Sequence, residues 1–186
     1  MGLVRTYSEK EVAAILKASE GQGVAAERGQ GHSEGLHELV AVGRGREHTS
    51  EADLAERVLD ERKKAVGAFD GCQAKAVTWA LNTAAGQNAL MYLNNSSVRF
   101  LFAEIDVANQ FFQMKHIQAV VPRIGPIAKP VIQSSNVVYV AMKLMKEGTN
   151  LHIRTAFPMV AAPACGHSHC EITYVGNTSM DQDLTI

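Results

Sequence analysis

In the first half of the chain, apolar residues recur every three or four positions, which is the period of an amphipathic helix. The helices that this pattern predicts cover residues 6–19, 34–42, 49–69 and 73–92. The glycine-rich stretch 20–35 predicts a loop, and Ser8 and Glu11 have the spacing of a capping box. The residues expected to face inward are Val12, Ile15 and Leu16; Leu36, Leu39 and Val40; Leu54, Val58 and Leu59; and Val77, Ala80, Leu81 and Ala84.

From residue 97 the pattern changes to short β-branched or aromatic runs that are separated by Gly, Pro, Asn and Ser. The predicted strands cover residues 98–107, 117–125, 136–145, 151–160 and 171–176. Helices in one half and strands in the other predict an α+β fold with an antiparallel sheet, not an alternating βαβ fold. Within 151–160, simple alternation places Leu151, Ile153, Thr155 and Phe157 on one face, and His152, Arg154 and Ala156 on the other.

Composition limits the function classes. The 186 residues suit one domain with tails, and no run of about 18 apolar residues predicts a membrane span. The net charge of −1 excludes a strongly basic nucleic-acid-binding domain. A local basic excess lies in residues 96–160, which hold 7 Lys and Arg against 3 Asp and Glu. Three cysteines cannot all pair within one chain, so we expect no disulfide framework.

Several groups of residues follow one another in the order typical of a known family. They are Gly31-His32 with His37; Asp53-Leu54 with Arg57; Phe69 with Ala76 and Ala80-Leu81; and Val140 through Thr155-Ala156-Phe157-Pro158. On these residues the chain resembles the bacterial RNase A-like toxin domains, which form the C-terminal ends of contact-dependent growth inhibition proteins and related polymorphic toxins. The resemblance covers about residues 7–160, roughly four-fifths of the chain.

The resemblance implies an RNase A-like α+β fold, in which N-terminal helices pack on a C-terminal antiparallel sheet. Residues 1–160 would form the toxin domain, and residues 161–186 would be a C-terminal extension and a candidate to complete the sheet. The expected partners are an RNA substrate, with tRNA as one candidate, and a cognate immunity protein, and the domain is otherwise a monomer. It would be delivered from a cell surface or secretion system into the cytoplasm of a neighbouring bacterium.

The resemblance also assigns the site. It places the catalytic residues at His37, Arg57 and Thr155, and it places Phe157 where the family has a tyrosine. The segment between His37 and the next helix is longer than in the family, so His32 and His48 remain alternatives for the catalytic histidine.

These residue types suit RNA cleavage without a metal or cofactor, because the 2′-hydroxyl of RNA can attack the adjacent phosphorus. An imidazole accepts that proton near neutral pH, and an arginine stabilises the phosphorane charge. Thr155 would donate a hydrogen bond to the phosphate, and Phe157 would stack a base. Lys143 and Arg154 are further candidates for RNA phosphate contacts.

Two alternative functions remain open, a zinc-dependent enzyme and a non-catalytic module. The run Cys165-Gly166-His167-Ser168-His169-Cys170 holds four ligands of the types that bind zinc or copper, and it could instead form a local disulfide or an exposed tail. With His32-Ser33-Glu34 it superficially resembles the motifs of a zinc-dependent nucleobase deaminase, although Ala164 breaks the Pro-Cys pair. The second alternative is a non-catalytic interaction module on the same fold.

Overall fold

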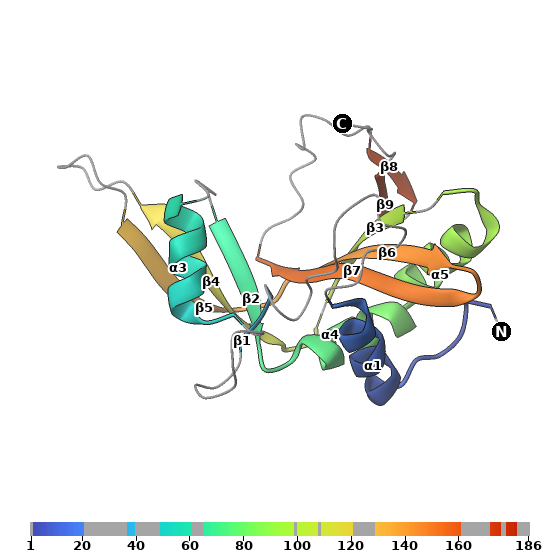
Figure 1. Ribbon diagram of the computed structural model, residues 1–186, viewed down its shortest axis with the longest axis horizontal. Coiled ribbons are helices and arrows are strands. Elements are labelled where there is room, and N and C mark those ends of the chain that lie inside the picture. Colours follow the sequence, from blue (N-terminus) through green and yellow to red (C-terminus); the bar gives the residue numbers. More distant parts are fainter. Residues whose placement is uncertain are drawn as a thin grey trace.

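The computed structural model describes residues 2–20, 37–39, 49–60, 65–98, 100–107, 109–120, 129–160, 172–175 and 178–181. Within these residues the chain forms four helices and two β-sheets, which confirms the α+β class (Figure 1). The prediction of one sheet is wrong, because a four-stranded and a five-stranded sheet lie side by side. Cys72 is a free thiol, and the other two cysteines lie outside the described residues.

The first helix, α1, covers Glu9–Ser19 and begins as predicted. The Ser8 side chain accepts a hydrogen bond from the Glu11 backbone N–H at 3.3 Å, and the Glu11 carboxylate accepts one from the Ser8 N–H at 2.9 Å. This is the reciprocal pairing of a capping box. Val12 and Leu16 are buried, so the predicted inward stripe is confirmed at these two positions.

The four-stranded sheet takes two of its strands from segments that we predicted to be helical. β1 covers Glu38–Leu39 and β2 covers Ala65–Asp70, and the two strands pair in parallel. The helices predicted over 34–42 and over the end of 49–69 are therefore wrong at these residues. The sheet order is β1-β2-β4-β5, where β4 covers Gln113–Val120 and β5, which the pattern did not predict, covers Lys129–Asn136.

Helix α3, Glu51–Asp60, covers one face of the four-stranded sheet. Its buried Leu54 and Val58 pack with Val66 and Ala68 of β2, as the helical stripe predicted for the first two. Side chains alternate across a strand, so Gly67 and Phe69 point to the opposite face. Phe69 belongs to the main core of the protein.

The predicted helix over 73–92 is two helices, α4 over Gln73–Asn82 and α5 over Ala84–Asn95. Thr83 separates them: its extended backbone ends α4, and its side chain caps α5 by accepting from the Gly86 N–H at 3.0 Å. Val77, Ala80 and Leu81 are buried as predicted, whereas Ala84 is exposed because it starts the second helix.

The five-stranded sheet has the order β7-β6-β3-β9-β8. Its strands are β3 Phe100–Asp106, β6 Tyr139–Glu147, β7 Asn150–Met159, β8 Ile172–Val175 and β9 Thr178–Asp181. Helices α1, α4 and α5 pack on this sheet and form the main core with it. Gly148, with φ +60°, makes the tight turn between β6 and β7 in a conformation that favours glycine.

A β-bulge interrupts β7 and changes which residues share a face. Lys143 of β6 lies opposite Thr155, and the next residue, Leu144, lies opposite Ile153, so Arg154 is the extra residue. The alternation predicted for this strand is therefore wrong beyond Ile153. Ala156 joins the core face, and Thr155 and Phe157 share the opposite face with His152.

Candidate functional site

The imidazole of His37 is held by the backbone of the four-stranded sheet. His37 directly precedes β1, and its Nδ1 lies 3.1 Å from the carbonyl oxygen of Gly67 in β2. A carbonyl oxygen can only accept a hydrogen bond, so Nδ1 carries the hydrogen. In the neutral ring the proton-accepting lone pair is then on Nε2. This is the tautomer that a general base needs.

The segment that carries His37 is tied to β7 through Gln73. The Glu38 carboxylate accepts a hydrogen bond from the Gln73 backbone N–H at 3.0 Å, at the start of α4. The Gln73 side chain is buried, and its Nε2 donates to the Ala156 carbonyl at 3.1 Å. Since Ala156 lies between Thr155 and Phe157, these bonds set the position of β1 relative to that part of β7.

Phe157 brings the His37 ring to the five-stranded sheet. The ring centroids of His37 and Phe157 are 5.4 Å apart, and Phe157 is 5.9 Å from the ring of Phe102 on β3. These separations are in the range of favourable aromatic contacts. His37 and Phe157, which lie 120 residues apart and which the family resemblance assigned to one site, are therefore in contact.

Thr155 presents an unsatisfied hydroxyl on the same face as Phe157. The residue is buried, and its Oγ1 has no hydrogen-bond partner within the described part of the chain. Lys143 lies directly opposite Thr155, and Phe102 of β3 lies opposite Lys143. Cross-strand neighbours point to the same face. The face therefore carries an amine, a hydroxyl and two aromatic rings beside His37.

Two further predicted residues lie on α3 and in the bulge of β7. Arg57 is partly buried on α3, which packs against β2, β4 and β5 rather than on the five-stranded sheet. Arg154 is the extra residue of the bulge and is partly buried. Their assignment to the site stays a prediction.

The sequence does not indicate three residues: Gly67 and Gln73, which bond to residues of this site, and His116, which lies opposite Gly67. The sequence does not indicate a role for Gly67, because the pattern around it predicts a helix. Gln73 could have been noticed only as a polar residue at the start of a predicted helix. His116 lies in β4, and its position opposite Gly67 depends on strand pairing that no local pattern contains.

Several residues of the alternative readings lie outside the described residues, among them His32, His48 and Cys165 through Cys170. Within the described ranges, no group of three or more His, Cys, Asp or Glu residues could hold a metal ion. In the same ranges, no helix has the length and apolar character needed to cross a membrane.

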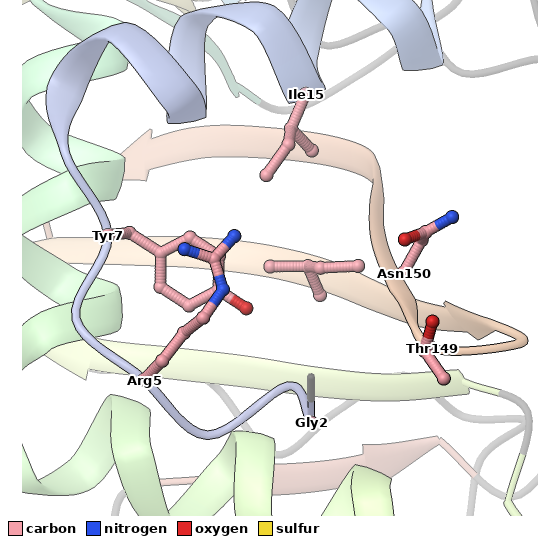
Figure 2. Close-up of a pocket in the computed structure, with 7 residues that line it drawn as sticks. Gly2, Arg5, Tyr7, Ile15, Thr149 and Asn150 are labelled. Carbon is pink, nitrogen blue, oxygen red and sulfur yellow. The ribbon is translucent and has the colours of Figure 1, made fainter.

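A pocket of about 420 Å³ lies at the other end of β7 (Figure 2). The Arg5 guanidinium lies over the Tyr7 ring, 4.3 Å from its centroid, and is also paired with the Glu11 carboxylate at 2.7 Å. The pocket is lined by Gly2, Arg5, Tyr7, Ile15, Thr149, Asn150 and Leu151. None of these residues belongs to the group around His37, so the pocket is separate from the candidate site.

Comparisons of the chain with protein-family models, with curated proteins and with solved structures found no match.

Proposed function

We propose that this chain is a metal-independent endoribonuclease toxin domain with an RNase A-like fold. It cleaves cellular RNA by attack of the 2′-hydroxyl on the adjacent phosphorus, and the product ends in a 2′,3′-cyclic phosphate. The observation that carries the proposal is the hydrogen bond from His37 Nδ1 to the Gly67 carbonyl, beside Phe157. It gives the site an imidazole in the tautomer of a general base.

In the proposed reaction, His37 Nε2 removes the proton of the 2′-hydroxyl. The oxygen then attacks the phosphorus, and negative charge builds on the non-bridging oxygens of the phosphate. A base with a pKa near the working pH is best suited to this step, and an ordinary imidazole has a pKa of about 6.5. DNA has no 2′-hydroxyl and is not cleaved by this route.

The groups on the five-stranded sheet would receive the phosphate. Buried polar groups in native proteins are nearly always hydrogen-bonded, so the Thr155 hydroxyl is well suited to donate to a ligand oxygen. Lys143 lies opposite it and supplies positive charge from the same face. Arg57 and Arg154 are proposed to contact phosphates from outside this group, and the exposed part of the Phe157 ring would stack a base.

The biological role that we propose follows from the family resemblance. Such a domain acts in interbacterial competition, is delivered as part of a larger toxin, and acts in the cytoplasm of the target cell. A cognate immunity protein would protect the producing cell by binding the domain, which is otherwise monomeric. A near-neutral chain can bind RNA when basic groups lie beside the site, as Lys143 does opposite Thr155.

The test is incubation of the purified chain with total RNA and with single-stranded DNA in EDTA, followed by analysis of the RNA ends. The proposal predicts cleavage of RNA alone with 2′,3′-cyclic phosphate ends. Base conversion that appears only after zinc is restored would instead support the deaminase reading. No reaction under either condition would support a non-catalytic interaction module.

A further inference from the structure

Cleavage by this route also needs a proton donor, because the departing 5′-oxygen would otherwise leave as an alkoxide. The family resemblance supplies one histidine only, and Thr155 is far too weak an acid for the task. In the described part of the chain, a second imidazole, that of His116, lies on the strand at the other side of β2.

His116 of β4 and His37 meet the same residue, Gly67. In the β2–β4 pairing, His116 lies directly opposite Gly67, whose carbonyl oxygen holds His37 Nδ1. Gly67 has no side chain beside the His116 ring, and Met114 and Pro158 approach its backbone there. The two imidazoles therefore come from the two segments that flank β2, and both lie beside the same glycine.

The face on which His116 lies is the face that meets β7. Met114, two residues earlier in β4, shares this face and belongs to the main core. A Cβ atom placed on Gly67 would lie 2.8 Å from Met114 Cε and 3.4 Å from the carbonyl oxygen of Pro158, the residue after Phe157. His116 is thus on the wall of the four-stranded sheet that approaches the strand of Thr155 and Phe157.

His116 is poorly explained as a structural residue. It is only 6% exposed, yet its Nδ1 is buried without a hydrogen-bond partner within the described residues. Unsatisfied buried polar atoms are rare in native proteins, and functional sites are one place where they persist. At a position flanked by Met114 and Gly67, an apolar side chain of similar size would avoid this cost.

We propose that His116 is the general acid of the cleavage reaction, which deepens the proposed function and rests on it. His37 Nε2 takes the proton from the 2′-hydroxyl, the bond from the 2′-oxygen to phosphorus forms, and the bond from phosphorus to the 5′-oxygen breaks. The proton on the His116 ring then moves to the 5′-oxygen. The two histidines exchange roles when water hydrolyses the cyclic phosphate. His116 then takes the proton from water, and His37 returns a proton to the 2′-oxygen.

The test compares two substrates that differ only in the leaving group. One set is dinucleotides, in which the 5′-oxygen must be protonated as it leaves. The other is the para-nitrophenyl esters of the same nucleoside 3′-phosphates, whose leaving group is stable as an anion and needs no acid. We measure kcat/KM on both for the parent, for His116→Gln and His116→Asn, and for His37→Gln.

We expect His116→Gln to lose about 10²–10⁴-fold on dinucleotides, the usual contribution of a general acid, and to stay within about threefold of the parent on the esters. His37→Gln loses activity on both substrates, because both reactions need the base. The ratio of the two activities within one variant does not depend on how much of the protein is folded, and His116→Asn serves if His116→Gln does not fold.

Lys115→Ala is the matched control, because Lys115 is the neighbouring residue on the α3 face of β4, where it pairs with Glu51 at 3.1 Å. It should leave both activities unchanged. Suppose that the parent cleaves RNA. The proposal is then overturned if the His116 variants lose kcat/KM equally on the two substrates, or if they lose none on dinucleotides. A parent that cleaves neither substrate would instead overturn the proposed function.

Discussion

The Nδ1 atom of His37 lies 3.1 Å from the carbonyl oxygen of Gly67, and this contact links the edge of β1 to the middle of β2. It fixes the tautomer of the imidazole and holds its ring against Phe157 of the other sheet. The candidate site is therefore formed where the two sheets meet. Gly67 is central to this arrangement, because its carbonyl binds His37 and its missing side chain leaves room for Met114 and Pro158.

Gly67→Ala tests this close approach. The added Cβ would lie 2.8 Å from the end of Met114, which can move, and 3.4 Å from the backbone oxygen of Pro158, which moves less easily. We expect a loss of about 1–3 kcal/mol in the free energy of unfolding, the usual cost of overpacking, measured by urea denaturation. Gly2→Ala is the control, because its Cβ would make only an ordinary contact at 3.8 Å, and it should change stability little. Equal stability of the two variants would contradict this description of Gly67.

Ser19→Ala tests how the bulge in β7 is held. The Ser19 hydroxyl accepts from the Ile153 backbone N–H at 3.2 Å and also bonds to His152 Nδ1 at 3.1 Å, all of them buried. Burial lowers the pKa of His152, so the ring is neutral near pH 7 and its Nδ1 can accept from Ser19. Removing the hydroxyl leaves buried groups unsatisfied, and we expect a loss of about 1–3 kcal/mol in unfolding free energy.

The control for Ser19 is Ser134→Ala on β5, where the serine is exposed. It should stay within about 0.5 kcal/mol of the parent, as surface substitutions usually do. If Ser19→Ala were equally neutral, the hydroxyl would not be what supports the bulge. If it is destabilising, Thr155 depends for its orientation on a residue 136 positions earlier in the chain.

Contacts between distant segments explain which features could be predicted from the sequence. The capping box of Ser8 and Glu11 is local, and both its bonds were predicted. The orientation of Thr155 was not, because alternation alone cannot reveal a bulge that is held by Ser19 of a distant helix. The sequence predicts the end of a helix over β2, whereas pairing with β4 decides the structure of this segment.

The site, too, combines features that were predicted with features that depend on contacts between distant segments. His37 and Phe157 were assigned together through a family resemblance, and the structure places their rings in contact. Gln73 and His116 could not be identified, because their positions depend on bonds and pairings between segments that are far apart.

Phe157→Leu tests base stacking by the aromatic ring. Leucine keeps apolar bulk against His37 and Phe102 but has no π-face, and stacking of one base is worth about 1–3 kcal/mol. We expect KM for RNA to rise roughly 5–150-fold with a smaller change in kcat, measured by steady-state kinetics on short single-stranded RNA. Phe157→Tyr keeps the ring and should hold KM near the parent value. A KM unchanged in Phe157→Leu would show that the ring stacks no base.

Glu11→Gln tests the electrostatics of the α1 start. The Ser8 backbone N–H, followed by Arg5, lowers the pKa of the Glu11 carboxyl to about 2 in the folded protein. A lowered folded-state pKa means that the carboxylate stabilises the fold above its unfolded pKa of about 4.3 and that this contribution disappears as the pH falls toward 2. Glu11→Gln should therefore lower the Tm at pH 7 and match the parent near pH 2. A Tm difference that is independent of pH would contradict this assignment.

The most direct test of the central claim is the chemistry of the RNA ends left by the parent and by His37→Ala, with both proteins folded and both reactions run in EDTA. We predict that the parent releases fragments ending in 2′,3′-cyclic phosphate and that His37→Ala releases none. Fragments without a cyclic phosphate, or cleavage by His37→Ala at the parent's rate, would contradict the account.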